Sequence, residues 1–222
     1  MKHYKYFSFI TGIFCAALVI SNILDTKLFQ IGSTAFPAGI ILFPIVYVFG
    51  DIFTEVYGYS QSRKAIWAGF FSLLILVISL EIAKHLEPAS FWQDQAAFET
   101  ILGKVWRIAI ASITAYLCGE FVNSFTMAKM KLKQQGKAMP VRFIFSTILG
   151  QAVDTSVFIV IAFSGTMSVA AMFTVFLSAW IFKVVWEVVA LPISIPLVNW
   201  LKKVENEDYF DNDTNFNPFK IS

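Results

Sequence analysis

The chain has 222 residues, of which 57% are hydrophobic, 17% aromatic and only 14% charged. A water-soluble domain is typically about 45–50% apolar and about 25% charged, so the composition excludes that class and indicates an integral membrane protein. The formal net charge of +2 gives no indication of a nucleic-acid partner.

Three apolar runs in the first part of the chain predict membrane-spanning helices. The first covers Phe7–Leu24 and has about the length needed to cross a hydrocarbon core of ~30 Å. The second covers Phe36–Tyr57, is entered through Pro37, and is interrupted by Pro44, which predicts a kink in the helix. The third covers Ala65–Ile82 and is almost free of charge, so it is expected to contact lipid.

The remaining part of the chain predicts one surface helix and three more spans. Residues 86–104 are too polar to cross a membrane, but their apolar residues recur at near-helical spacing, which is typical of an amphipathic helix on the membrane surface. The fourth, fifth and sixth spans are predicted at Trp106–Met127, Val141–Phe163 and Ala170–Leu191. Pro192 and Pro196 are expected to break the last helix.

Together these runs predict an all-α bundle of six transmembrane helices in residues 1–202, followed by a polar cytoplasmic tail in residues 203–222. Segments on one side of the predicted membrane hold twelve Lys and Arg residues and those on the other side hold four, which places both termini in the cytoplasm. The tail is expected to be loosely ordered. GDIFTEV in the second span weakly resembles GQAVDTSV in the fifth, which allows two inverted repeats of three helices each.

Five of the six predicted spans contain two polar residues three or four positions apart, a spacing that places both on one helix face. The pairs are Asn22/Asp25, Asp51/Glu55, Glu120/Asn123, Gln151/Asp154 and Lys183/Glu187. A charged side chain at the bilayer centre costs roughly 2.5–3.5 kcal/mol, so these residues are expected to avoid lipid. One such pair could simply join two helices by hydrogen bonds. Five pairs on five helices predict one shared polar cavity.

Asp51 and Glu55 lie at the centre of this prediction. One helical turn apart in a poorly solvated cavity, they are expected to share one proton, which a ligand with N–H donors or a positive charge would release. The alternative is that Asp51 only caps a kinked helix or bonds to another span. The excess of acids over Lys183 favours proton coupling or a donor-rich ligand, and it disfavours anions.

The sequence shows no pattern typical of an enzyme, a metal site or a cofactor. Cys15 and Cys118 fall in apolar runs and are expected to be buried thiols, and the two histidines are isolated. Glycine-rich phosphate loops and zinc-binding HExxH motifs are absent from the sequence. An intramembrane aspartyl hydrolase using Asp51 and Asp154 is a minor alternative, because the flanking residues of such proteases are missing.

Four long segments occur in an order that matches a known family: PAGIILFPIVYVFGDIFTEVYGYSQSRKAIWAGF, ASITAYLCGEFVNSFTMAKMK, STILGQAVDTSVFIVIAF and FKVVWEVVALPISIPLVNWLKK. Together with the terminal DTNFNPFK, they resemble the queuosine precursor transporters, also called the vitamin-uptake-transporter family. The resemblance implies uptake of 7-cyano- and 7-aminomethyl-7-deazaguanine, which are precursors of a tRNA modification, across a bacterial or archaeal inner membrane.

A deazaguanine would suit the polar pairs. Its N–H donors can bind a carboxylate in bidentate fashion, and its carbonyl oxygen can accept from an amide or an ammonium group. Its flat face can stack on an aromatic ring, for which Phe43, Tyr47, Trp180 and Trp186 are candidates, although each such ring is more often a packing residue. The predicted substrate-binding residues are Asp51, Glu55, Glu120, Asn123, Gln151, Asp154, Lys183, Glu187, Asn22, Tyr47 and Trp186.

The sequence therefore predicts a membrane transporter, not an enzyme, that imports a deazapurine without a cofactor and with proton coupling as an option. The alternative is a substrate-binding membrane subunit for another vitamin or nucleobase, energised by a separate ATPase module. The predicted partners are the deazapurine substrate and the lipid bilayer, with a homodimer left open and no nucleic acid.

Overall fold

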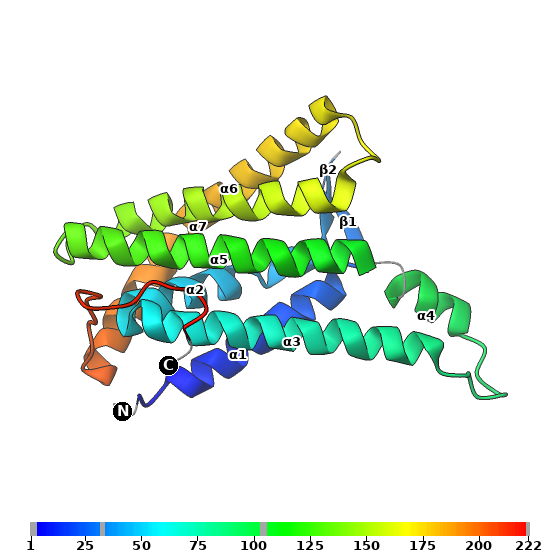
Figure 1. The fold of residues 1–222 in the computed structure, drawn as a ribbon, viewed down its shortest axis with the longest axis horizontal. Helices are drawn as coiled ribbons and strands as arrows, with labels where there is room; N and C mark the ends of the chain where they lie inside the picture. The colour runs from blue at the N-terminus through cyan, green and yellow to red at the C-terminus, as the bar shows by residue number, and fades with distance from the viewer. Residues whose placement is uncertain (1–3, 32–33, 103–105, 221–222) are drawn as a thin grey trace.

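The structure is a computed structural model that describes residues 4–31, 34–102 and 106–220. Its elements, in chain order, are α1 (Phe7–Leu24), β1 (Leu28–Ile31), β2 (Thr34–Pro37), the 3₁₀ helix η1 (Ala38–Ile41), α2 (Phe43–Tyr57), α3 (Tyr59–His85), α4 (Gln95–Leu102), α5 (Trp106–Lys133), α6 (Met139–Phe163) and α7 (Val169–Glu205). The long helices run along the longest axis of the molecule, with both termini at one end and α4 at the other (Figure 1). The predicted helical membrane bundle fits this architecture.

Within the described residues, four helices are long and apolar enough to cross a membrane, namely α1, α3, α6 and α7. Helix α2 has only 15 residues, which at ~1.5 Å per residue is shorter than a hydrocarbon core of ~30 Å. Helix α5 is long enough, but it carries several charged residues along its 28 positions. Six spans therefore stay a prediction.

The second predicted span differs most from the structure. A continuous helix was expected from Phe36 through Tyr57, whereas the chain forms an antiparallel β1–β2 hairpin and η1 before α2 begins at Phe43. Pro44 does not kink this helix, because it sits in the first turn, where its missing N–H has no helical acceptor. The correction moves the N-terminal half of this apolar run out of the helix.

The last helix continues through its two prolines. Pro192 and Pro196 were expected to break it, but α7 runs without interruption to Glu205. Ser194 Oγ donates to the carbonyl oxygen of Ala190 at 3.0 Å, beside the gap that Pro192 leaves in the ladder of backbone hydrogen bonds. Prolines are tolerated in membrane helices when neighbouring groups satisfy the freed backbone atoms.

Helices α5 and α6 cross at very short range through two glycines. A Cβ atom on Gly119 would lie 3.1 Å from the carbonyl oxygen of Gly150, and one on Gly150 would lie 2.7 Å from Cβ of Asn123. Small residues are the usual means by which membrane helices approach each other closely. This crossing places the polar faces of α5 and α6 next to each other.

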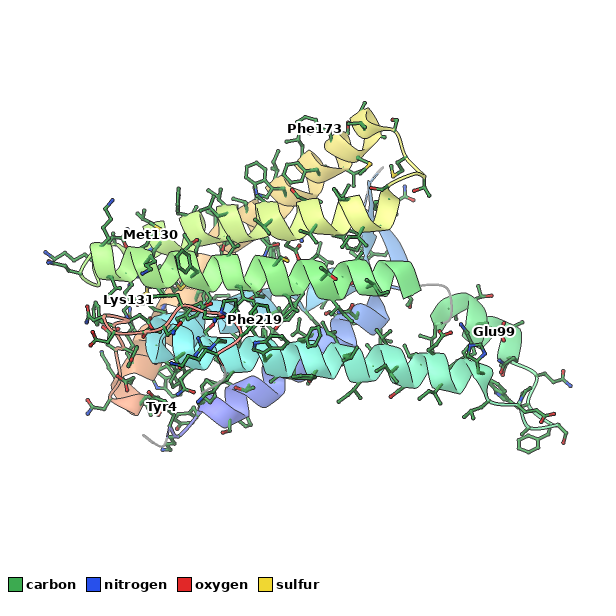
Figure 2. All side chains as sticks on the ribbon, viewed as in Figure 1. Tyr4, Glu99, Met130, Lys131, Phe173 and Phe219 are labelled. Carbon is green, nitrogen blue, oxygen red and sulfur yellow. The ribbon has the colours of Figure 1, made fainter. Side chains whose placement is uncertain are left out.

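The outer face of α3 is apolar and exposed, as expected for contact with lipid. Phe71, Ile75, Ile78 and Ile82 are each about half exposed or more. The short helix α4 falls inside the segment predicted to be an amphipathic surface helix, and none of its residues is buried. Glu99 of α4 lies at the opposite end of the bundle from Tyr4 and Lys131 (Figure 2).

The C-terminal tail, residues 206–220, packs against the bundle instead of being loosely ordered. The buried carboxylate of Asp211 accepts from the backbone N–H of Tyr59 at 3.1 Å. Arg63 donates to the carbonyl oxygens of Asn215 and Asn217 at 2.9 and 2.8 Å. Backbone carbonyls of the tail thus satisfy a buried guanidinium, which a polar sequence alone does not reveal.

Glu205 joins the end of α7 to the start of α1. Its carboxylate accepts from the backbone N–H groups of Lys5 and Tyr6 at 2.9 and 2.6 Å and from the hydroxyl of Tyr57 at 2.9 Å. A carboxylate at this position satisfies N–H groups next to the first turn of α1, which have no helical partner. The contact fixes the two ends of the chain at the same end of the bundle.

Candidate functional site

A cavity of about 680 Å³, with a largely apolar wall that also holds polar side chains, lies inside the bundle, between α1, η1, α2, α3, α5, α6 and α7. Its volume is within the range of about 300–1,000 Å³ that is typical of small-molecule sites. Its polar lining consists of Ser21, Asn22, Asp25, Tyr47, Ser112, Tyr116, Glu120, Gln151, Asp154, Thr155, Ser178 and Lys183. Six of the ten residues in the five polar pairs line this cavity, whereas neither member of the Asp51/Glu55 pair does.

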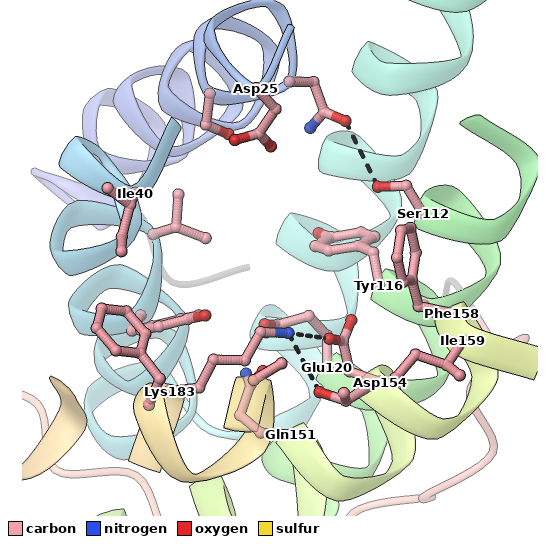
Figure 3. Close-up of a pocket in the computed structure, with 18 of the residues that line it drawn as sticks. Asp25, Ile40, Ser112, Tyr116, Glu120, Gln151, Asp154, Phe158, Ile159 and Lys183 are labelled. Carbon is pink, nitrogen blue, oxygen red and sulfur yellow. Dashed lines mark hydrogen bonds and ion pairs between the residues drawn. The ribbon is translucent and has the colours of Figure 1, made fainter. Parts of the chain in front are cut away.

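One side of the cavity, called the floor here, holds Glu120, Gln151, Asp154 and Lys183 (Figure 3). Lys183 of α7 forms an ion pair with Asp154 of α6, and its ammonium lies 3.4 Å from the hydroxyl of Thr155. About a fifth of each ion-paired side chain remains exposed. The floor thus offers carboxylate acceptors and one ammonium donor to the same space.

The opposite side of the cavity is built by the end of α1. Ser112 Oγ donates to Asn22 Oδ1 at 3.5 Å, and the Asp25 carboxylate faces the floor across the open space (Figure 3). Asp25 Oδ1 is buried and has no hydrogen-bond partner among the described residues. The backbone at Gly39 lies so close to Asp25 that a side chain there would collide with this carboxylate. A ligand would therefore meet acidic groups on both sides.

Aromatic rings form part of the wall, but they are not all the ones predicted. Tyr47 lines the cavity as expected, together with Phe158 and Phe182. Trp186 lies outside the lining and stacks on Phe182, with ring centroids 6.4 Å apart and an interplanar angle of 7°.

The other two predicted aromatics do not add to the wall. Trp180 donates from Nε1 to the carbonyl oxygen of Ile148 at 2.9 Å, and it does not belong to the lining either. The Phe43 side chain lies outside the part of the chain that the structure describes.

Three predicted site residues, Asp51, Asn123 and Glu187, lie one helical turn further toward the end that holds the termini. They are buried, and none of them lines the cavity. Asn123 Nδ2 donates to Asp51 Oδ1 at 3.1 Å, and the Asp51 and Glu187 carboxyl groups interact with each other. The sequence allowed a Lys183–Glu187 pair across one turn, but Lys183 pairs with Asp154 instead.

Glu55 does not share a site with Asp51. Its carboxylate binds Arg142 in bidentate fashion, from Nε and from Nη2, each at 2.7 Å, and accepts from Lys202 at 2.5 Å. Both Glu55 and Arg142 have fully buried side chains. The Glu55 carboxylate is therefore held by cations. The prediction that Asp51 and Glu55 share one proton is wrong. Glu55 occupies the last turn of α2, where the basic ends of α5, α6 and α7 meet.

This set of charged residues, the Glu55 cluster, consists of Glu55, Lys131, Arg142, Lys202 and Asp208. Lys131 Nζ lies 3.7 Å from Glu55 Oε1 and 2.5 Å from Asp208 Oδ1 in the tail. Burial alone would raise the pKa of Asp208, but hydrogen bonds from Lys131 and Lys202 hold the pKa below its usual range. The cluster therefore ties the tail to the ends of the helices as an ionised network.

The structure brings six of the eleven predicted binding residues to the cavity: Asn22, Tyr47, Glu120, Gln151, Asp154 and Lys183. The sequence prediction missed Ser112 and Tyr116, which lie about two turns and one turn, respectively, before Glu120 on the same face of α5. It also missed Thr155 and Phe158, which continue the face of Gln151 on α6. Extending each polar pair by helical spacing would have found them.

Comparisons with known proteins agree with a membrane transporter. The protein family described as "Putative vitamin uptake transporter" matches residues 37–197. The "Probable queuosine precursor transporter" of Bacillus subtilis strain 168 is 27% identical over 177 residues, which cover 79% of this chain and 77% of that relative. A relative with the same description from Haemophilus influenzae is 27% identical over 125 residues, 56% of this chain and 51% of the relative. No solved structure matches the chain.

The chain belongs to the vitamin uptake transporter family, because the family match covers well over half of its length. It is a multi-pass membrane transporter and not an enzyme.

Proposed function

We propose that this chain imports 7-deazaguanine precursors of queuosine, in the 7-cyano or 7-aminomethyl form, and binds them in the polar cavity. The names of the two relatives point to this substrate class. The observation that carries the proposal is the floor of the cavity, where two carboxylates and one ammonium face a space of about 680 Å³. That space is large enough for a bicyclic base and its substituent.

Each part of a deazaguanine would find a complementary group there. The adjacent N1–H and N2–H₂ donors suit the carboxylate of Glu120, because a carboxylate accepts two parallel hydrogen bonds. The ring carbonyl oxygen suits the ammonium of Lys183, which extends into the same space. The flat face suits the ring of Phe158 or Phe182 in the wall, since stacking on an aromatic contributes ~1–3 kcal/mol per base.

Binding and uptake of radiolabelled deazaguanines by the purified protein test this function. The expected result is thermal stabilisation and uptake with 7-cyano- or 7-aminomethyl-7-deazaguanine, and neither effect with adenine. Glu120→Gln is expected to weaken binding by about tenfold or more, because it replaces a charged acceptor with a neutral amide. Glu81→Gln is the matched control, since Glu81 is half exposed and lies outside the cavity. Unchanged binding by Glu120→Gln would place the ligand elsewhere.

The source of energy is proposed to be the proton gradient, without a separate ATPase. Support comes from the number of carboxyl groups in and below the cavity, which can carry protons through a membrane protein. Uptake by the purified chain alone in liposomes without ATP is the expected result. Uptake only after co-purified ATPase subunits and ATP are added would instead favour the substrate-binding subunit of an ATP-driven importer.

We also propose that the protein resides in the cytoplasmic membrane with both termini in the cytoplasm. The Glu55 cluster and most Lys and Arg residues lie at the end that holds the termini, as the positive-inside rule requires. A single cysteine at Gln95 should react with a membrane-impermeant maleimide in intact cells, whereas one at Gln135 should react only after lysis. Both native cysteines are replaced by alanine in this experiment, and the reverse accessibility would invert the topology.

A further inference from the structure

In the cavity floor and just below it, several buried acceptor oxygens have no hydrogen-bond donor among the described residues. They are Asp51 Oδ2, Asn123 Oδ1, Gln151 Oε1 and both carboxylate oxygens of Glu187. Asp51 is only 2% exposed and Glu187 only 1%. Buried polar atoms in proteins nearly always have a partner, so this group of acceptors indicates a donor that the side chains themselves do not supply.

A proton bound to the carboxyl groups of Asp51 and Glu187 is the simplest source of the missing hydrogen-bond donor. They come from α2 and α7, which pack against each other, and they lie within hydrogen-bonding reach of one another. Two ionised carboxylates have only acceptors, whereas a protonated carboxyl group donates one hydrogen bond. Two like charges in a site sheltered from water also repel each other strongly, which favours one bound proton on the pair.

No basic side chain in the described ranges forms an ion pair with Asp51 or Glu187. Asn123 Nδ2 donates to Asp51 Oδ1 at 3.1 Å, and Asp51 Oδ2 has no partner among the described residues. The other titratable or charged groups around the pair are Tyr47, Glu120, Asp154 and Lys183 toward the cavity, and Glu55 with Lys131, Arg142 and Lys202 on the other side. These cations already form ion pairs with Asp154 and Glu55. A proton is therefore the positive charge that fits between the carboxylates of Asp51 and Glu187.

We propose that Asp51 and Glu187 form a proton-carrying pair that couples the proton gradient to movement of substrate through the cavity above it. The proposal rests on the transport function given in the preceding subsection and adds the site at which the driving ion binds. It differs from the sequence prediction in the partner of Asp51, which is Glu187 on α7 and not Glu55 on α2.

The position of the pair gives the proton a mechanical role. While the proton is bound, one carboxyl group donates to the other carboxylate and holds α2 against α7 below the cavity. When the O–H bond breaks, its electron pair stays on the carboxylate and the proton passes to water on the cytoplasmic side. The two negative charges then repel, which favours separation of α2 and α7 and an open path from the cavity to the cytoplasm.

Transport by purified protein in liposomes tests the coupling. With the outside more acidic by one pH unit and choline replacing sodium, a carrier that moves one proton per substrate is expected to concentrate 7-cyano-7-deazaguanine about tenfold. Asp51→Asn and Glu187→Gln should each abolish this accumulation while reducing substrate exchange at equal pH far less. Glu81→Gln, a substitution of an exposed acid, should behave like the wild type. Accumulation by both variants, or accumulation that requires sodium, would overturn the proposal.

Infrared spectroscopy tests the shared proton without any substrate. At neutral pH the wild-type protein should show the C=O stretch of a buried protonated carboxyl group that resists exchange into deuterated water. The band should disappear in the Asp51→Asn/Glu187→Gln double variant and persist in Glu81→Gln. A spectrum without this difference would refute the proton-carrying pair even if deazaguanine uptake is confirmed. Failure of deazaguanine to bind, with the band present, would refute only the proposed substrate.

Discussion

Replacement of Arg142 by alanine is expected to destabilise the protein by about 3 kcal/mol or more, because it leaves the Glu55 carboxylate buried with weaker compensation. Glu55 and Arg142 are both fully buried and make two hydrogen bonds of 2.7 Å. The substitution also removes a donor to the carbonyl oxygen of Lys137, at 2.6 Å in the loop that precedes α6. The measurement is the thermal unfolding midpoint of the purified protein in detergent.

A double-mutant cycle separates the pair from its surroundings. Glu55→Gln combined with Arg142→Met should be less destabilising than the sum of the two single changes, because neither buried charge is then left alone. Arg142→Lys should recover only part of the loss, since an ammonium cannot make the two parallel hydrogen bonds of a guanidinium. Lys203→Ala, at an exposed position in the same region, should have little effect. Equal stability of Arg142→Ala and the wild type would show that the ion pair does not hold these helices together.

The helices were predictable where hydrophobic length alone decides them. The first predicted span, Phe7–Leu24, has the same bounds as α1, and the fifth differs from α6 only at its first two residues. Both segments are predominantly apolar and lie between polar segments, so the end of the apolar run is also close to the end of the helix. In such segments the ends of the helix can be predicted from the sequence alone.

Hydrophobic length fails where the backbone has more than one way to satisfy its hydrogen bonds. Residues before Phe43 are as apolar as those of α2, yet they pair as a hairpin and coil into η1. Proline gives opposite results at two places: Pro44 begins a helix, and Pro192 lies inside one. The difference depends on which neighbouring groups satisfy the backbone, and one sequence does not reveal them.

The kinds of residue that line the cavity were predictable from the sequence, but how far along the helices the cavity extends was not. Helical spacing correctly brought Glu120 and Asp154 to one space, because their faces are set by local geometry. Glu55 was misplaced because α2 ends at Tyr57, which brings this residue to the level of Arg142, 87 positions later in the chain. Gly58, with φ of +81°, allows the abrupt change of direction into α3. A contact of this range leaves no periodic signal in the sequence.

Substitution of Lys183 by methionine is expected to change which deazaguanine the transporter prefers. Among the described residues that line the cavity, Lys183 is the sole basic side chain, and it faces the carboxylates of Asp25, Glu120 and Asp154. The change keeps an unbranched side chain, one atom shorter, but removes one positive charge and the donor proposed for the ring carbonyl oxygen. The neutral 7-cyano form should therefore bind more weakly, whereas the cationic 7-aminomethyl form should gain from the additional negative charge.

The ratio of the two dissociation constants measures this effect and cancels any general loss of folded protein. We expect the ratio to move by about tenfold or more toward the aminomethyl form, which corresponds to ~1.4 kcal/mol of differential binding. Lys183→Arg keeps the charge and should leave the ratio nearly unchanged, even if its bulk weakens both ligands. An equal loss of affinity for both forms in Lys183→Met would contradict a direct role. Lys183 would then act only by positioning Asp154 through their ion pair, and the charge of the ligand would be read elsewhere in the cavity.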